Sequence, residues 1–263
     1  MEKYDRIGRG YDSTRSADDH ILGRMAELMG PVKKGRYLDV GCGTGNYTAG
    51  LHAMGYPIAG LDPSMEMIAT AKKKFPKIDW HLGSAENPGM PRGSIQGIFA
   101  TLTLHHWPDL KAAFRALDTI LVPDGRMVIF SSDPQQMAGY WLNHYFPDMM
   151  QSSIDQMPSL EQIKRSLWNT SLELRMIQSY NIRPDLKDLF LYCGKHRPER
   201  YLDPVIRKGI SSFADLAYAN EVALGLIHLE RDIESGQIDR IMQTYANGDG
   251  DYRFFVLEKP SSS

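Results

Sequence analysis

Short apolar segments alternate with helical patterns through the first half of the chain, and this alternation is what most constrains the fold. Strands are predicted at 36–41, 57–62, 78–86, 94–104 and 126–132. Between them, amphipathic spacing predicts helices at 46–55, 64–75 and 109–121, and a further helix at 15–30 precedes the first strand. Strands that alternate with single helices are typical of a parallel sheet covered on both faces.

The second half of the chain does not continue this alternation of strands and helices. About 38 residues follow Asp133 before the next strand pattern at 172–182, which is too long for an ordinary connection. The sequence "SLEQ" within this insertion is a capping box that starts a helix at Ser159. A mostly helical stretch at 185–246 and a last strand at 252–259 complete the chain.

These patterns predict an α/β fold: a Rossmann-like, doubly wound, mostly parallel seven-stranded sheet with a helical lid insertion after the fifth strand. A single domain over residues 1–263 is expected. Its expected parts are a helical cap at 1–35, a core at 36–132, a lid at 133–170 and a C-terminal part at 171–263 that completes the sheet.

Composition narrows the function classes. The chain has 263 residues and a net charge of −2, which offers no basic surface for nucleic acid. Two cysteines, Cys42 and Cys193, are too few for a disulfide scaffold or a zinc ribbon, so no metal site is expected. No apolar run reaches a bilayer-spanning length, and the N-terminus lacks a secretory signal. We therefore expect a reduced, cytoplasmic protein, whose oligomeric state the sequence does not indicate.

The segment "YLDVGCGTG" points to the ligand. Its glycines, Gly41, Gly43 and Gly45, follow a spacing that differs from the usual dinucleotide loop. Asp39 precedes them, and a pyrophosphate placed there would meet an uncompensated like charge. Asp62, at the end of the second predicted strand, suits the hydroxyls of a ribose. The loop thus favours a nucleoside with a cationic, amino-acid-like end, and S-adenosylmethionine has these features.

Four ordered motifs over residues 36–131 carry a family resemblance: "LDVGCGTG", "GLDPSMEMIATAKKK", "GSAENPGM" and "GSIQGIFATLTLHHWPDLKAAFRALDTILVPDGRMVIF". They resemble those of the class I S-adenosylmethionine-dependent methyltransferases, in particular the ubiquinone/menaquinone-methyltransferase-like (type 11) group. The resemblance implies S-adenosylmethionine as cofactor and S-adenosylhomocysteine as product.

The resemblance also implies roles for individual residues. Asp39 and the backbone of Gly41 and Gly43 would hold the methionine end, and Asp62 the ribose. Ser64 or Met65 would flank the adenine. Further cofactor-binding candidates are Gly45, Thr101 and the segment Ser84, Ala85 and Glu86. Relatives commonly have an aspartate that reaches the adenine amino group, and this chain departs from them by having Ser84 at that position. Relatives also close an N-terminal segment over the cofactor, so Tyr11 and Arg15 are candidate lid residues.

Methyl transfer needs few catalytic side chains, since the cofactor carries the reactivity and the protein supplies position and a dry cavity. The candidates for a base are His105 and His106, at the carboxyl end of the fourth predicted strand. The alternative is that one histidine caps the following turn and the other is buried as part of the structure.

Two clusters are candidates for substrate selection. Helical spacing would place Met137 and the substrate-binding candidates Tyr140, Trp141, His144 and Tyr145 on one helix face. Such a face could close over a hydrophobic or cationic substrate, or it could be ordinary core. A basic cluster could bind a carboxylate or phosphate, or be a solvated connector; its members are Lys195, His196, Arg197 and Arg200.

The function predicted from the sequence is S-adenosylmethionine-dependent methyl transfer to a small-molecule acceptor by in-line displacement. The sequence does not choose among oxygen, nitrogen, sulfur and carbon acceptors. Two alternatives remain at this stage: a non-catalytic, S-adenosylmethionine-binding regulatory protein, and an NAD-dependent oxidoreductase, which Asp39 and the glycine spacing disfavour.

Overall fold

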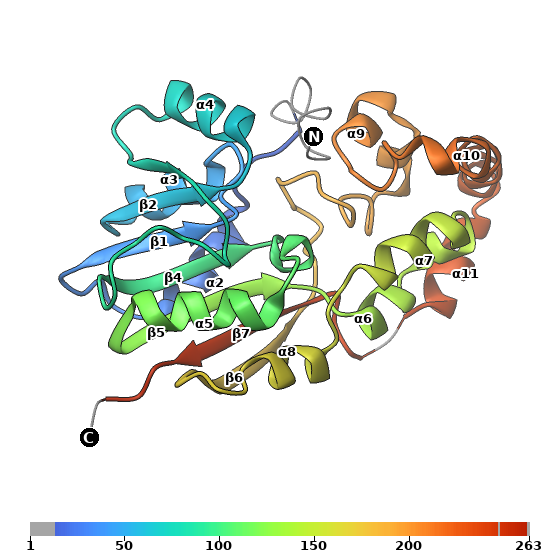
Figure 1. The fold of residues 1–263 in the computed structure, drawn as a ribbon. Helices are drawn as coiled ribbons and strands as arrows, with labels where there is room; N and C mark the ends of the chain where they lie inside the picture. The colour runs from blue at the N-terminus through green and yellow to red at the C-terminus, as the bar shows by residue number, and fades with distance from the viewer. Residues whose placement is uncertain (1–13, 247, 262–263) are drawn as a thin grey trace.

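A computed structural model describes residues 14–246 and 248–261. Its centre is a seven-stranded sheet in the order β3-β2-β1-β4-β5-β7-β6 (Figure 1). The strands are β1 (Arg36–Val40), β2 (Ile58–Asp62), β3 (Trp80–Leu82), β4 (Ile95–Thr101), β5 (Leu121–Ser131), β6 (Glu173–Tyr180) and β7 (Tyr252–Glu258). β7 runs antiparallel to both β5 and β6, and every other pair is parallel. The predicted Rossmann-like, mostly parallel seven-stranded sheet is confirmed.

Helices and helical turns flank the sheet and extend beyond one end of it. The α-helices are α2 (Asp19–Met29), α3 (Asn46–Ala53), α4 (Met65–Lys74), α5 (Leu110–Ile120), α6 (Pro134–Ala138), α7 (Pro147–Asp155), α8 (Leu160–Ser166), α9 (Pro204–Lys208), α10 (Ala219–Glu234) and α11 (Gln237–Thr244). The 3₁₀ turns are η1 (Leu104–His106), η2 (Trp141–His144), η3 (Pro198–Leu202) and η4 (Leu216–Tyr218). In the described ranges, no helix is both long and apolar enough to cross a membrane.

Each face of the sheet has its own apolar core because successive strand residues point to opposite faces. Tyr37 and Phe99 belong to the core that includes α2 and α3. Leu38 and Ile98, one position along each strand, belong to the core under α5 and α8. α5 buries Ala113, Phe114, Leu117 and Ile120, the face that its sequence spacing predicts.

The helices beyond the sheet form a cap over the carboxyl ends of the parallel strands (Figure 1). They come from two insertions: α6, η2 and α7 between β5 and β6, and η3 to α11 between β6 and β7. α8 starts at the predicted Ser159 capping box. It is not part of the cap, however, because its Ile163 packs in the core under α5. The stretch predicted as mostly helical from 185 becomes helical only at Pro198.

The single helix face predicted for Met137 to Tyr145 is wrong. α6 ends at Ala138 with Gly139 as its C-cap, and η2 begins only at Trp141. The amide of Asn143 donates to the carbonyl oxygens of Met137 (2.8 Å) and Tyr140 (2.7 Å). A continuous helix would use these same carbonyls in its backbone ladder, so the side chain of Asn143 stabilises the break.

Two predicted strands differ most from their observed bounds. β3 covers only Trp80–Leu82, because it is an edge strand that pairs with β2 alone and β2 ends at Asp62. β5 begins earlier than expected, at Leu121, and pairs there with Ile95 of β4. Residues 83–86, predicted as strand, instead form a wall of the site described next.

Candidate active site

Three neighbouring cavities lie at the carboxyl ends of the parallel strands. The large cavity, about 440 Å³, is lined by residues that include Gly41, Gly43, Asp62, Ser84, Ala85, Glu86 and Thr101. The loop cavity, about 50 Å³, is lined by residues that include Asp39, Gly41, Cys42, Gly43, Thr101 and Asp188. The cap cavity, about 110 Å³, lies against the cap and is lined by residues that include Met137, Met149, Ser153, Met157, Phe190 and Ser212.

The glycine loop that joins β1 to α3 separates the large and loop cavities. Gly41 has φ +73°, and a Cβ on it would fall 1.9 Å from the Oγ1 of Thr103. Gly43 has φ +54°, but a Cβ there would meet no atom within 4 Å. Gly41 is therefore required by packing against Thr103, whereas Gly43 leaves free space on the side of the cavities.

Asp39 is a buried carboxyl group beside the loop. Its Oδ2 accepts a 2.6 Å hydrogen bond from Thr48, and no described residue hydrogen-bonds its Oδ1. Burial raises the pKa of Asp39 to about 7, the Thr48 hydrogen bond opposes this rise, and the charge of Asp62 adds to it. A buried carboxyl oxygen without a partner suits a ligand that brings an ammonium group.

Asp62 ends β2 at the other side of the loop. Its Oδ2 accepts a hydrogen bond from the backbone N–H of Gly43 (2.9 Å), and its Oδ1 accepts one from that of Ser64 (2.9 Å). The carboxylate thus ties the glycine loop to the start of α4 while it lines the large cavity with Ser84. This is where the sequence expected a ribose.

Three of the predicted cofactor residues do not line these cavities. Gly45 is the N-cap of α3 and packs closely against Trp80. Ser64 is the N-cap of α4, where its hydroxyl accepts from the N–H of Met67 (3.3 Å), and Met65 is 71% exposed. Met67, two residues after Met65, lines the large cavity instead. Helix capping therefore turns Ser64 away from the ligand side.

The two histidines lie in η1, directly after β4. His106 lines both the large and the cap cavities, and His105 lines the cap cavity. Their ring centroids are 3.8 Å apart. Leu102, which also lines both cavities, has φ +54°, a strained value for a residue with a side chain. The backbone therefore bends sharply where the two cavities meet.

The predicted aromatic residues of the cap belong to its core. Tyr140, Trp141 and Tyr145 are buried, and none of them lines the three cavities, nor does His144. The hydroxyl of Tyr140 bonds that of Tyr201 (2.5 Å). Because α6 ends before Tyr140, these rings point into the packing between the two insertions. Methionines and serines line the cap cavity in their place.

The basic cluster does not face the cavities either. Lys195 pairs with Asp251, and Arg200 donates to the carbonyl oxygen of Cys193 (2.8 Å). A ring nitrogen of His196 lies 2.7 Å from the carbonyl oxygen of Ile182. These residues, together with Arg197, are absent from the linings of the three cavities. The contacts of Lys195, His196 and Arg200 lie within the protein, as expected of a connector between elements.

Of the two N-terminal candidates, Arg15 lines all three cavities. Tyr11 lies outside the described residues. The sequence reasoning missed Asp188, which pairs with Arg15, because no local motif surrounds it and 173 positions separate the two residues. It also missed Thr103, whose contact with Gly41 closes the loop from β4. Neither contact could be found without the tertiary structure.

The residues present fit a nucleoside with a cationic amino-acid end. The large cavity has the size of a small-ligand site, and the Asp39 oxygen without a partner lies beside the loop. An unobstructed Gly43 allows close approach to the backbone. These features match S-adenosylmethionine.

Comparisons with known proteins agree with this fit. A family model described as a methyltransferase domain matches residues 38–129. A malonyl-acyl-carrier-protein O-methyltransferase of Hamiltonella defensa is 25% identical over 196 residues, or 71% of this chain and 72% of that protein. A demethylmenaquinone methyltransferase of Chlorobaculum parvum is 26% identical over 152 residues, which cover 50% of this chain but only 63% of that protein.

Solved structures extend the likeness to nearly the whole chain. A putative methyltransferase from an antibiotic biosynthesis pathway of Anabaena variabilis has 31% identity and a TM-score of 0.80, covering 92% of this chain and 98% of its own. A geranyl diphosphate C-methyltransferase of Streptomyces coelicolor shares the fold, with a TM-score of 0.57 and 11% identity over 91% of this chain and 78% of that one.

Proposed function

The chain belongs to the class I S-adenosylmethionine-dependent methyltransferases of the type 11 group, and from this premise we propose which cavities bind the cofactor and which binds the methyl acceptor. As a member, it transfers a methyl group from S-adenosylmethionine to a small-molecule acceptor. The observation that carries the proposal is that a cofactor-sized cavity meets a second cavity at His106 and Leu102.

We propose that the large cavity takes the adenosine and that the loop cavity takes the methionine end. Asp62 accepts hydrogen bonds from the ribose, and Ser84 to Glu86 lie beside the base. The free Oδ1 of Asp39 accepts from the ammonium group, whose charge favours the ionised carboxylate. Arg15 is the only arginine or lysine among the described residues that line these two cavities, and it faces the carboxylate.

The cap cavity is proposed as the acceptor site. The bound cofactor supplies an electrophilic methyl group on a sulfonium. The protein holds the acceptor atom in line with it and excludes water. Met137, Met149 and Met157 offer an apolar wall, while Ser132, Gln156 and Ser212 offer neutral hydrogen-bonding groups. The lining also holds two charged residues, Arg15, which is paired with Asp188, and Asp215, which caps η4. This lining favours an uncharged acceptor with an apolar body and hydroxyl or carbonyl groups.

His106 is the proposed base or positioning residue, because it lines both the proposed cofactor cavity and the proposed acceptor cavity. A protonated oxygen or carbon acceptor must lose its proton as the methyl group is transferred, and histidine titrates in the working range. The named activities of the relatives above, O-methylation and methylation of a demethylmenaquinone, are consistent with such acceptors. We also propose that the part of residues 133–170 that precedes α8 supplies part of a lid, together with the helices between β6 and β7.

Thermal melting tests the cofactor assignment. S-adenosylmethionine or S-adenosylhomocysteine at about a hundred times its dissociation constant should stabilise the protein by about 2.7 kcal/mol, or roughly 5–10 °C. NAD should have no effect, because its pyrophosphate would approach Asp39. A methyl-transfer assay over uncharged hydroxylated metabolites then tests the acceptor class. Binding of the cofactor without turnover of any member of a broad panel would favour the regulatory alternative.

The Asp62→Ala variant tests the ribose contact. Loss of the carboxylate removes an acceptor for the ribose and releases the N–H of Gly43, so S-adenosylhomocysteine affinity should fall at least about tenfold. Isothermal calorimetry measures the change. The control is Asp79→Ala, an exposed aspartate in a weak surface pair with Arg36. Equal affinity in Asp62→Ala and wild type would refute the assignment.

A further inference from the structure

Arg15 occupies a central place among the cavities. Of the described residues it alone lines all three, so this one residue borders the proposed sites of adenosine, methionine end and acceptor. Arg15 precedes the first described helix, α2, and its side chain is 15% exposed. A long, flexible side chain in such a place needs a partner to hold it in one rotamer.

Asp188 is that partner. Its Oδ1 lies 2.6 Å from the Nε of Arg15, and its Oδ2 lies 3.0 Å from Nη2, a two-pronged contact that sets the plane of the guanidinium. The hydroxyl of Tyr47 in α3 donates to Oδ2 (3.3 Å), and the N–H of Ser16 donates to Oδ1 (3.4 Å). The carboxylate side chain is 1% exposed, so these four contacts replace its lost hydration.

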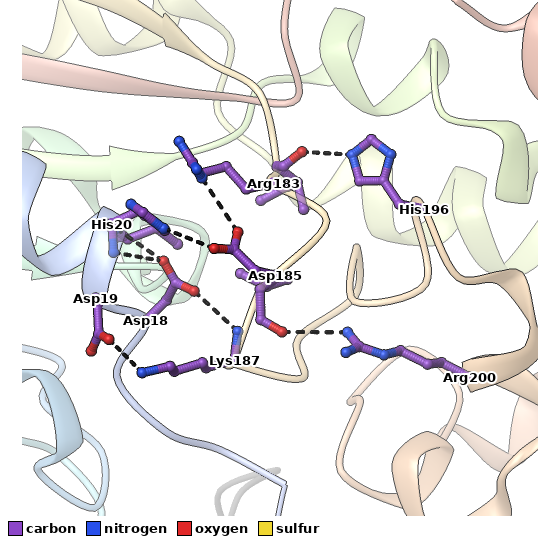
Figure 2. Close-up of polar contacts among 11 residues, drawn as sticks. Asp18, Asp19, His20, Arg183, Asp185, Lys187, His196 and Arg200 are labelled. Carbon is purple, nitrogen blue, oxygen red and sulfur yellow. Dashed lines mark hydrogen bonds and ion pairs between the residues drawn. The ribbon is translucent and has the colours of Figure 1, made fainter.

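Asp188 belongs to a segment that we call the strap, residues 182–191, between β6 and the cap. The strap binds along the chain that leads into α2. The N–H of Leu189 donates to the carbonyl of Thr14 (3.1 Å), and the N–H of Lys187 donates to the carboxylate of Asp18 (3.0 Å). The carboxylate of Asp18 also accepts a hydrogen bond from the N–H of His20 at the start of α2 (3.0 Å; Figure 2).

The other side of the strap is held by the basic cluster that the sequence singled out. His196 contacts the carbonyl of Ile182, and Arg200 donates to that of Leu186 (3.4 Å), as Figure 2 shows. The strap is thus anchored on both sides along its backbone. Just after Asp188, Phe190 and Leu191 line the cap cavity. One segment therefore contributes to both the loop cavity and the cap cavity.

We infer that Asp188 is a positioning residue for the methyl-donor site: it holds Arg15 in the orientation that receives the carboxylate of the cofactor. This inference rests on the proposed function. Arg15 touches the ligand, and Asp188 acts through Arg15. Docking of the strap on residues 14–18 thereby completes the donor site, and the same strap carries part of the acceptor wall.

The test is a double-mutant cycle on cofactor affinity. Asp188→Asn keeps the size of the side chain but loses the two-pronged ion pair, so S-adenosylhomocysteine should bind about tenfold more weakly by calorimetry. S-adenosylmethionine should weaken by the same factor, because both ligands carry the same carboxylate. In an Arg15→Gln background, Asp188→Asn should add little further loss, because there is no guanidinium left to position.

The matched control is Asp185→Asn. Asp185 lies in the same strap, but it is 59% exposed and pairs with His20 and Arg183 at the surface, where ion pairs contribute little. Its affinity should equal that of wild type. Asp188→Glu keeps the charge and serves if Asp188→Asn does not fold. Its longer side chain shifts the carboxylate against Arg15, so the expected loss is at least about threefold.

Several outcomes would overturn the inference. They are an unchanged affinity in a folded Asp188 variant, fully additive losses in the cycle, or a loss confined to S-adenosylmethionine, which would mean that Asp188 acts by attracting the sulfonium. If wild type itself binds neither ligand, the proposed function fails first. Normal wild-type binding with an unaffected Asp188 variant would reject only the positioning role.

Discussion

Among single residues, Asp39 is the one whose environment sets a condition on the whole site. Its carboxyl group is 1% exposed and has one hydrogen-bond donor, Thr48, among the described residues. Burial raises its pKa from 3.8 to about 7. Near neutral pH about half of the ligand-free molecules therefore carry a proton on Asp39, which a cationic ligand must displace. The sequence motif predicted a carboxylate at this position but contained no information on its burial.

The first prediction concerns pH. Because the pKa of Asp39 is raised on folding, its contribution to stability is full below about pH 4 and is lost as the pH rises through about 7. The ligand-free protein should lose stability over this range. An ammonium group favours the ionised form, so S-adenosylhomocysteine should bind more tightly as the pH rises from 6 to 8, by up to about tenfold.

Calorimetry in two buffers of different ionisation enthalpy should detect the proton released on binding at pH 6. Asp39→Asn supplies the control, since its affinity should be weak and independent of pH over this range. Identical wild-type affinities at pH 6 and pH 8, with no proton release, would show that Asp39 is already ionised without ligand.

Among the elements, the loop between β1 and α3 combines two different requirements in one glycine motif. Gly41 lets Thr103 approach from the end of β4, and Gly43 lets a ligand approach from the cavities. Both have positive φ, but only Gly41 is enclosed by protein atoms. The spacing in the sequence does not distinguish these two roles. Gly45, at the same spacing, serves a third, as the N-cap of α3.

Alanine substitutions should separate the two roles. Gly41→Ala places a Cβ against Thr103, so we expect a fall in melting temperature of several degrees or failure to fold. Gly43→Ala meets no protein atom and carries only the backbone strain, about 1–2 kcal/mol. It should stay folded and lose S-adenosylhomocysteine affinity. Differential scanning fluorimetry and calorimetry measure the two effects, and equal destabilisation by both changes would contradict the distinction.

For the whole molecule, the shape of the cap cavity, the proposed acceptor site, depends on how two insertions meet. Ser153 in α7 and Ser212 after α9 come from different insertions, and their hydroxyls are 2.8 Å apart beside the cap cavity. Met137 comes from the first insertion and Phe190 from the strap. No contiguous motif encodes this cavity. The lid predicted after the fifth strand includes only the first of these two insertions.

Filling the cap cavity tests its role. Ser212→Phe should lower methyl transfer to an acceptor found in the panel at least about tenfold, because the cavity is only about 110 Å³. S-adenosylhomocysteine affinity should not change, since Ser212 lines neither the large nor the loop cavity. The control Ser235→Phe lies on the exposed end of α10. Full activity in Ser212→Phe would place the acceptor elsewhere.

The sequence alone determined the sheet, its helices and the cofactor class. These follow from local periodicity and from a loop whose residues are neighbours in the chain. Asp39, Gly41, Gly43 and Asp62 were expected near one ligand site, and they line two neighbouring cavities, because adjacent parallel strands end at the same edge. The sequence also placed Ser64, Met65 and the cap aromatics at the ligand sites, but they do not line the cavities. A helix cap at Ser64 and the break at Gly139 give these side chains other surroundings.

Tertiary structure decided how the site is closed. The pairing of Arg15 with Asp188, the strap on residues 14–18 and the joining of the two insertions over the strand ends all link segments far apart in sequence. Such contacts form because the folded core fixes the ends of each segment, and local sequence propensity does not predict them. The cap cavity, which we propose as the acceptor site, is therefore a property of the assembled cap, whereas the cofactor class is already determined by the local sequence of the loop.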